Sequence, residues 1–306
     1  MKIAIVGAGG IGGYIGAKLL HAKEAEVTVV ARGKHLEAIK NHGLLVYDEE
    51  EEFRVSGDHF TQTPLQFAPF DVVIFCTKSY DLKEAAWHMV PCVDENTLLF
   101  ALCNGLGHEK TLAGVFPHNP IATACLYILS NIQSPGVIKK YGSVFLLIAG
   151  QTGTPHPHLY QLAMAFKNAN MPFKLSDDIA LACWKKYLFI SVFGTLTAFY
   201  DKPIGWLMEH QSDEVRALLH EVVAIANAQG VDVSETHATQ AYEQAQTKVP
   251  YGATTSLQLD IRAGNPSEFE TLTGYLVTQA RNHALSTPTL VSLYTELLQK
   301  IKGTLS

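Results

Sequence analysis

Short apolar runs recur along the first half of the chain, each ending at small or turn-forming residues. Runs of this length, rich in Val, Ile, Leu and Phe, are typical of parallel strands that are buried on both faces. Helical patterns follow the first two runs. We predict four such strands, at Lys2–Val6, Glu26–Ala31, Asp71–Cys76 and Thr97–Cys103.

Later segments of this half also have strand character. Gly43–Ser56 alternates apolar and polar residues around an acidic turn, Asp48–Glu52, which predicts a hairpin with a solvated loop. Ile121–Ile128 and Gly136–Ile148 predict two more strands, and we expect them to extend the same sheet. Met171–Asp177 then predicts a link to a second domain.

Beyond Asp177 the strand patterns end and helical periodicity dominates. Gln211–Gln229, for example, places six apolar residues on one stripe of a helix. A chain of 306 residues has room for about two domains. The predicted fold class is therefore α/β, with an N-terminal Rossmann-type doubly wound sheet over residues 1–175 and an all-helical C-terminal domain over residues 176–306.

The first strand leads directly into the spacing G-x-G-x-x-G, formed by Gly7, Gly9 and Gly12. The first glycine allows a tight turn, the second lets a pyrophosphate approach the backbone, and the third lets the next helix pack closely. Free N–H groups at the start of that helix favour phosphate. The motif predicts a dinucleotide site whose candidate residues are Gly7, Ala8, Gly9, Gly10, Ile11 and Gly12.

Basic and amide side chains follow three of the predicted strands. Arg32 stands where NAD-binding domains place an acid, and a guanidinium suits the 2′-phosphate of NADP. The alternative is a solvated basic residue at a helix start. Lys78 and Asn104 lie at the carboxyl ends of later strands, where open α/β sheets bind ligands. Lys78 could equally be a surface residue, and Asn104 could be a turn former.

Composition narrows the classes of function. The formal net charge of −6 argues against a nucleic-acid or anionic-membrane surface. The five cysteines have no metal-binding spacing and suit a reducing cytoplasm, and no metal is expected. We identified no apolar segment approaching the roughly 20 residues that span a bilayer.

The helical half offers two side chains for chemistry. Lys186 lies within a predicted helix beside Trp184, where burial of an unpaired ammonium would be costly. Glu268 lies at the predicted start of another helix. Ser256 and Asp260 are spaced to share a helix face. Taken alone, each of these residues could equally be a surface charge or a helix cap.

Together, these features resemble the ketopantoate reductase (2-dehydropantoate 2-reductase) family, and the resemblance covers nearly the whole chain. The motifs occur in the family's order, although each is short. They are GAGGIG at Gly7–Gly12, Arg32, TK at Thr77–Lys78, NG at Asn104–Gly105, PGVI at Pro135–Ile138, W-x-K at Trp184–Lys186 and the stretch from Ser256 to Glu268.

The resemblance implies NADPH-dependent reduction of a 2-oxo acid, 2-dehydropantoate to pantoate, in pantothenate and coenzyme A biosynthesis. It implies that Arg32 and Lys78 hold NADP together with the glycine loop, and that Asn104 contacts cofactor or substrate. Lys186 would donate the proton, Glu268 would bind near the ribose and nicotinamide, and Ser256 would hold the substrate carboxylate. A homodimer is compatible with it.

Three positions depart from the family pattern. Ile190, Gly194 and Ile204 stand where the family has Asn, so the helix face beyond Lys186 continues with an aliphatic group and an expected open space. A more apolar 2-oxo acid is therefore an alternative substrate, unless Ser256, Asp201 or Tyr251 supply the missing bonds. A second alternative is a non-catalytic NADP-binding sensor, which would have no need of Lys186 as a proton donor.

Overall fold

The structure is a computed structural model that describes residues 1–49 and 51–304, with side chains to Lys302. The chain divides into two compact units. The first contains Met1–Cys103 and Gly107–Ile179, and the second contains Asn104–Leu106 and the chain from Ala180 onward. The helical unit thus takes a three-residue segment from the first half of the sequence.

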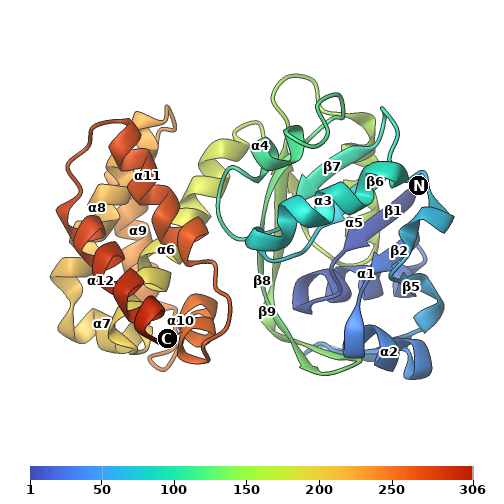
Figure 1. Ribbon diagram of the computed structural model, residues 1–306, viewed down its shortest axis with the longest axis horizontal. Helices are drawn as coiled ribbons and strands as arrows, with labels where there is room; N and C mark the ends of the chain where they lie inside the picture. Colours follow the sequence, from blue (N-terminus) through green and yellow to red (C-terminus); the bar gives the residue numbers. More distant parts are fainter. Residues whose placement is uncertain (50, 305–306) are drawn as a thin grey trace. The chain divides into compact units, whose positions relative to one another are not determined.

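A parallel five-stranded sheet forms one half of the first unit (Figure 1). Its strand order β5-β2-β1-β6-β7 is that of a doubly wound nucleotide-binding domain, which confirms the predicted fold class. Ile3 and Ile5 of the central strand pack into one apolar core, and Ala4 and Val6 into another. The strands are β1 (Lys2–Val6), β2 (Glu26–Val30), β5 (Phe60–Thr61), β6 (Val72–Phe75) and β7 (Leu98–Ala101).

Helices cover this sheet, and α1 and α2 lie where helical patterns follow the first two predicted strands. The described helices are α1 (Gly10–Ala22), α2 (Gly33–His42), α3 (Leu82–Met89), α4 (His108–Ala113) and α5 (Pro157–Asn168). Eight consecutive residues of α1, from Gly12 to Leu19, are buried. This helix therefore lies in the interior of the unit, and its N-terminus is held in a fixed place beside β1.

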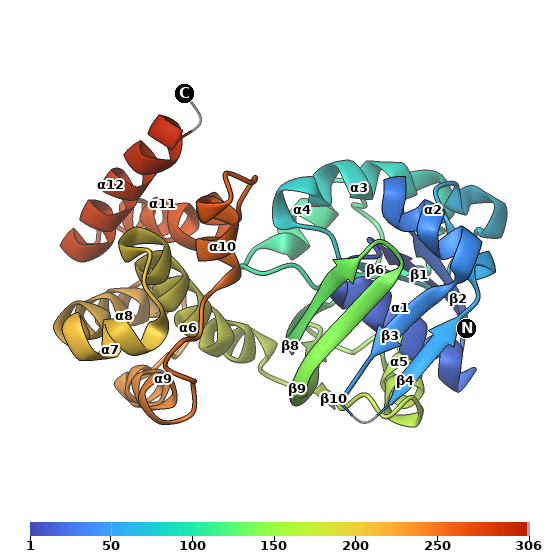
Figure 2. The same cartoon turned by 90° about the horizontal axis from the view of Figure 1, so that it is seen from below.

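The other strands form a second sheet, which contains both parallel and antiparallel pairs (Figure 2). The expectation that β8 and β9 extend the first sheet was wrong, although a bridge between Leu99 and Ile121 joins the segment before β8 to β7. The predicted link at Met171–Asp177 was also wrong, because β10 pairs with β9. The strands are β8 (Thr123–Ser134), β9 (Val137–Gly150), β3 (Leu44–Tyr47), β4 (Glu52–Val55) and β10 (Phe173–Leu175).

The turn between β3 and β4 is only in part the solvated loop that its acidic sequence suggested, because Glu49 and Glu52 are exposed but the Asp48 side chain is not. The Asp48 side chain is 7% exposed, and it accepts hydrogen bonds from the Tyr14 hydroxyl at 2.5 Å and the Lys140 ammonium at 3.1 Å. Glu51 accepts from Lys18 at 2.6 Å. Glu50 lies outside the described residues. Asp48 and Glu51 are paired with basic groups of α1 and β9, which local sequence cannot reveal.

The second unit is helical in its described residues. Its core is built on α6, whose Tyr187, Val192, Phe193 and Leu196 are at most 1% exposed. The predicted apolar stripe of α8 packs into the same core. The helices are α6 (Ile179–Tyr200), α7 (Ile204–His210), α8 (Ser212–Ala228), α9 (Glu235–Thr247), α10 (Ser256–Arg262), α11 (Tyr275–Asn282) and α12 (Pro288–Thr304), with a π-helical turn at Glu270–Gly274.

Helix α6 corrects one statement made from the sequence. It has 22 residues and a window of mean hydropathy 1.4, so it is long and apolar enough to cross a membrane, whereas we had found no such segment. In the structure 56% of that window is buried within the protein. A helix that is apolar on all sides is expected at the centre of a helical core, and α6 occupies that place.

We predict that Asp48→Asn destabilises the first unit by about 3 kcal/mol, because Lys140 would lose its partner in a buried site. Burial raises the pKa of Asp48, but the Tyr14 hydroxyl and Lys140 outweigh it, and the pKa is lowered overall. A carboxyl with a lowered pKa stabilises the fold above its unfolded pKa, and this stabilisation is lost as the pH falls through the folded pKa.

Urea unfolding between pH 7 and pH 3 measures this effect. The wild type should have a higher free energy of unfolding than Asp48→Asn at pH 7, and this difference should decrease as the pH falls. Glu49→Gln is the matched control, because Glu49 is exposed and only its backbone N–H contacts Asp48. Equal stability of all three proteins at pH 7 would contradict the assignment.

Candidate functional site

The glycine loop between β1 and α1 has the geometry of a dinucleotide site. Gly7 has φ +104°, and a Cβ there would lie 2.9 Å from the Cys76 carbonyl oxygen. A Cβ on Gly9 would meet no described atom within 4 Å, so this side of the loop is open. Among the described residues no side chain caps α1, and its first turn has no acid. The N–H groups of this helix therefore suit a phosphate.

Gly10 has a second role that the motif did not predict. Its Cα faces the backbone of Ser130 on β8, too closely for any side chain, and its carbonyl accepts a hydrogen bond from Ser130 Oγ at 2.9 Å. Gly13 packs against the side chain of Ile138 on β9. The extra glycines of the sequence GAGGIGG thus let the second sheet cross the start of α1. Cofactor binding by the Gly10 backbone stays a prediction.

Arg32 and Lys78 each immediately precede a helical element of the first unit. Arg32 precedes α2, its side chain is 77% exposed, and its guanidinium lies 3.5 Å from the Asp81 carboxylate. Lys78 immediately precedes the short 3₁₀ turn Ser79–Asp81 and bonds Asp81 through its backbone carbonyl. An exposed ion pair of this kind contributes about 0–1 kcal/mol, so the Arg32 side chain can readily exchange Asp81 for a phosphate.

The helical unit brings three of the predicted residues together. Lys186 Nζ donates a hydrogen bond to Asn104 Oδ1 at 2.9 Å, and Asn104 Nδ2 lies 3.4 Å from Glu268 Oε2 as a long hydrogen bond. Glu268 is 5% exposed, and Lys186 and Asn104 are half-buried. An ammonium, an amide and a carboxylate thus form one chain of hydrogen bonds. We call these three residues the Lys186 chain.

Each member of the Lys186 chain comes from a different element. Lys186 lies on α6, and Glu268 immediately precedes the helical residues that begin at Phe269. Asn104 is held by a loop in which Gly105 has φ +112° and Leu106 packs into the helical core. Residues 82 and 164 positions apart in sequence therefore meet at one amide.

Two family models match the chain, one in each half. The family model "Ketopantoate reductase PanE/ApbA" matches residues 3–149, and its C-terminal counterpart matches residues 178–301. The chain belongs to the ketopantoate reductase family. It is accordingly an oxidoreductase, and the sensor alternative is set aside.

Similar proteins cover the chain from end to end. An uncharacterized oxidoreductase of Bacillus subtilis, YkpB, is 26% identical over 97% of this chain and 98% of its own. A 2-dehydropantoate 2-reductase of Halobacterium salinarum is 27% identical over 96% of both. The crystal structure of a ketopantoate reductase from Ralstonia eutropha JMP134 superposes with a TM-score of 0.91, at 27% identity over all of both chains.

The positions where the sequence departs from the expected family pattern lie beyond the Lys186 chain. Ile190 lies one turn further along α6, half-buried against the helical core. The open space expected at Gly194 is not there, because Leu257 and Leu272 lie 3.6 and 3.7 Å from the place of its Cβ. Gly194 therefore contributes to packing. Ser256 is exposed as the first residue of α10, where Thr255 caps the helix by accepting from Gln258 N–H.

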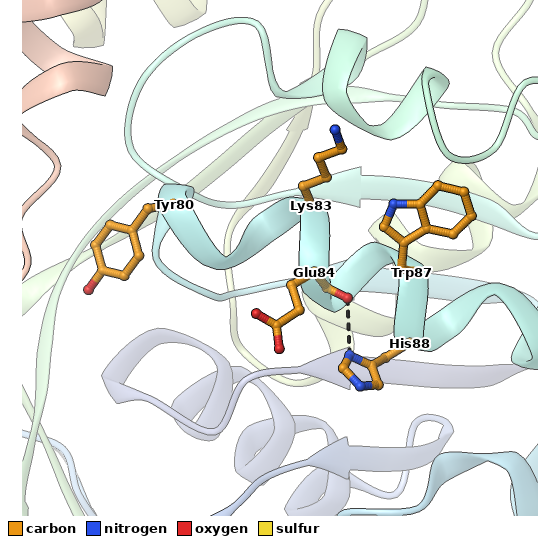
Figure 3. Close-up of a pocket in the computed structure, with 5 residues that line it drawn as sticks. All are labelled: Tyr80, Lys83, Glu84, Trp87 and His88. Atoms are coloured by element: carbon orange, nitrogen blue, oxygen red, sulfur yellow. Dashed lines mark hydrogen bonds between the residues drawn. The ribbon is translucent and has the colours of Figure 1, made fainter.

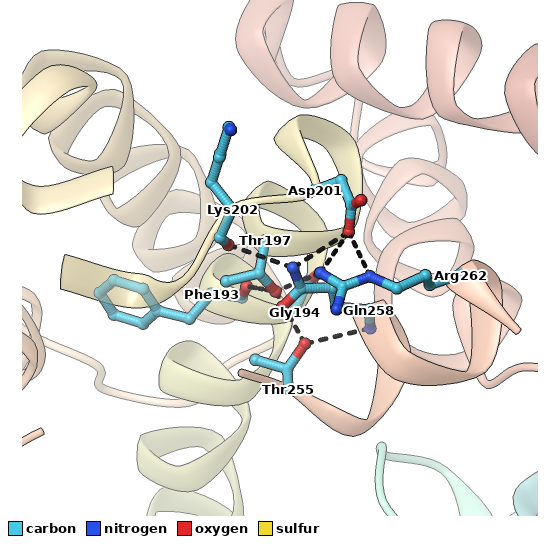
Figure 4. A network of polar contacts seen from close by, with 8 residues as sticks. All are labelled: Phe193, Gly194, Thr197, Asp201, Lys202, Thr255, Gln258 and Arg262. Carbon is cyan, nitrogen blue, oxygen red and sulfur yellow. Dashed lines mark hydrogen bonds and ion pairs between the residues drawn. The ribbon is translucent and has the colours of Figure 1, made fainter. Parts of the chain in front are cut away.

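Asp201 and Tyr251, two of the side chains considered as substitutes for the expected amides, have other partners, and Figure 4 shows those of Asp201. Asp201 accepts from Arg262 Nε at 2.8 Å and from Gln258 Nε2 at 3.2 Å. Tyr251 donates its hydroxyl to Glu209 at 2.9 Å. Thr197 contacts Thr255 and donates to the Phe193 carbonyl. These polar groups are occupied in holding α6, α7 and α10 together.

A surface hollow on α3 does not add to the site. It is lined by Tyr80, Lys83, Glu84, Trp87 and His88. Their side chains point in different directions, and His88 is bonded to the Glu84 backbone (Figure 3). Binding sites need polar groups that converge, so we assign this hollow no role. The described residues also hold no group of three His, Cys, Asp or Glu side chains able to bind a metal.

Proposed function

We propose that this protein catalyses NADPH-dependent reduction of a 2-oxo acid to a 2-hydroxy acid, with 2-dehydropantoate as substrate and pantoate as product. The reaction belongs to pantothenate and coenzyme A biosynthesis. The observation that carries the proposal is the Lys186 chain, in which an ammonium is bonded to Asn104 next to a buried carboxylate. Membership of the family supports it.

The proposed reaction needs a proton where negative charge develops. NADPH supplies a hydride to the carbonyl carbon of the 2-oxo acid, and the carbonyl oxygen becomes an alkoxide that must be protonated. Lys186 supplies the proton and stabilises the charge before transfer. Asn104 orients the ammonium through Oδ1, and its Nδ2 is directed at Glu268. Ser256 would bind the substrate carboxylate.

The first unit fits the proposed cofactor. The side of the loop at Gly9 is open to a pyrophosphate, and the uncapped start of α1 presents N–H groups to it. Arg32 is exposed at the end of β2, where a 2′-phosphate would lie, with Lys78 near by. NADP is therefore favoured over NAD.

A more apolar 2-oxo acid is a second candidate substrate. Ile190 follows Lys186 by one helical turn, and Asp201 and Tyr251 already have partners. A site without a donor or acceptor for the terminal hydroxyl of 2-dehydropantoate selects for it weakly. We also propose a cytoplasmic location, which suits the five free thiols. The proposed oligomeric state is a homodimer.

We predict that Lys186→Ala lowers kcat for 2-dehydropantoate reduction by about 10²–10⁴, the usual effect of losing a general acid, with little change in NADPH affinity. NADPH oxidation followed by absorbance, with a panel of 2-oxo acids, measures it. Lys185→Ala is the matched control, because Lys185 is an exposed neighbour on the same helix. Wild-type turnover by Lys186→Ala on the best substrate would refute the assignment.

Arg32→Ala is expected to weaken NADPH binding by about 1.5–3 kcal/mol while NADH binding is unchanged, because the lost contact is a charge-assisted bond to the 2′-phosphate. Calorimetric titration of both cofactors decides this. Lys34→Ala, the exposed neighbour, serves as control. A wild type that binds NADH as tightly as NADPH would contradict the choice of NADP.

The preference for a substrate hydroxyl distinguishes the two candidate substrates. We expect kcat/KM for 2-dehydropantoate to exceed that for its deoxy analogue, 2-oxo-3,3-dimethylbutanoate, by less than about a thousandfold, because the pocket face beyond Lys186 is aliphatic. A larger preference would show an intact hydroxyl-binding site and leave 2-dehydropantoate as the substrate.

A further inference from the structure

We propose that Tyr187 is a positioning residue for the reduction, whose buried hydroxyl sets the place of Glu268 relative to Lys186. The inference rests on the proposed function, because it assumes that the Lys186 chain carries the chemistry. Tyr187 follows Lys186 directly on α6, so one element holds both the ammonium and this hydroxyl.

The Tyr187 hydroxyl is bonded to the backbone segment that follows Glu268. It donates to the Leu272 carbonyl at 2.6 Å, and the Thr271 carbonyl is a second acceptor at 3.1 Å. The Leu272 N–H in turn donates to the Glu268 carbonyl at 2.9 Å. Leu272 thus connects Tyr187 to Glu268 through two hydrogen bonds, and the three residues form a continuous path from α6 to the backbone that carries the Glu268 carboxylate.

The acceptor carbonyls belong to the π-helical turn Glu270–Gly274. A π turn contains one residue more than an α-helical turn and is frequent at functional sites. At its end the Glu270 carboxylate folds over Gly274 and accepts from the Tyr294 hydroxyl at 3.1 Å. The turn is therefore fixed on one side by Tyr294 and on the other by Tyr187.

A second buried contact between α6 and the π-helical turn can be compared with that of Tyr187. Thr195, two helical turns beyond Tyr187, forms a hydroxyl pair with Thr273 at 2.7 Å. Ser191 lies between them on α6, and its buried hydroxyl has no hydrogen-bond partner among the described residues. Tyr187 and Thr195 thus make similar buried contacts with one turn, but only Tyr187 lies beside the Lys186 chain in sequence.

Tyr187 is suited to hold a position and unsuited to give up a proton. It is 1% exposed, and its ring lies edge-on to Trp184 and Tyr275, with centroids 5.5 and 5.9 Å away. Burial, with the neighbouring Tyr275, raises the pKa of Tyr187 well above its usual value. The hydroxyl therefore remains a hydrogen-bond donor throughout the working pH range.

Tyr187→Phe removes this hydroxyl with little change of shape. We expect kcat for 2-oxo acid reduction to fall about 10–100-fold, because small misplacements of catalytic groups have effects of this size. The KM for the 2-oxo acid should change less than threefold. Thr195→Val is the matched control: it should lower the Tm comparably while kcat stays within twofold of wild type. Equal losses of kcat in the two variants would overturn the proposal.

A double-mutant cycle separates positioning from general stability. In a Lys186→Ala background, Tyr187→Phe should cause no further loss of kcat, since the ammonium relative to which Tyr187 positions Glu268 is gone. Additive losses would overturn the proposal. If Lys186→Ala itself has wild-type turnover, the proposed function fails. If Lys186→Ala is impaired and Tyr187→Phe is not, this inference alone fails.

Replacement of Tyr187 by 4-aminophenylalanine keeps a hydrogen-bond donor at the same place. It also provides the test if Tyr187→Phe does not fold. Its kcat should stay within about threefold of wild type. A folded 4-aminophenylalanine protein that loses 10-fold or more would show that hydrogen-bond donation to Leu272 does not set the rate.

Discussion

The hydrogen bond between the Lys186 ammonium and Asn104 is the interaction on which the proposed chemistry of the helical unit depends. A half-buried ammonium and a buried carboxylate are costly unless polar groups satisfy them. Asn104 does this for both, since it accepts from Lys186 and directs its amide at Glu268. This need explains why three residues of the first half, Asn104–Leu106, belong to the helical unit.

Close backbone approach is the corresponding constraint in the first unit. The loop at Gly7–Gly12 must leave one side open for phosphate, and α1 must also be crossed by the second sheet. Gly9 serves the first need, whereas Gly10 and Gly13 serve the second. A glycine-rich motif can therefore leave one side open for the proposed phosphate while its other glycines pack against the second sheet.

Much of the fold could be predicted from the sequence, since β1, β2, β6 and β7 are locally apolar and the glycine motif has a fixed context. The second sheet could not be predicted, because neither hydrophobic periodicity nor composition identifies the strand with which a given strand pairs. Asp48 was misjudged for the same reason, as its partners are 34 and 92 residues away. At the candidate site, the roles of Lys186 and Glu268 were inferred from the order of the motifs.

Gly194 and Tyr187 show where local reasoning about the site ends. Helix spacing placed Gly194 on the face of Lys186 but could not show that Leu257 and Leu272 fill the space. Tyr187 reads as one more core aromatic, because the carbonyls that it bonds lie 84 and 85 residues further on. Both roles depend on contacts between helices distant in sequence.

Chemical rescue tests most directly the central claim that an ammonium at position 186 protonates the substrate. Lys186→Ala is assayed for NADPH-dependent 2-oxo acid reduction with increasing methylamine, ethylamine or propylamine at constant pH and ionic strength. The account predicts that one of these amines restores turnover with a saturable dependence on its concentration, and that Lys185→Ala does not respond. An equal response of both variants, or no response to any of the three amines, would contradict it.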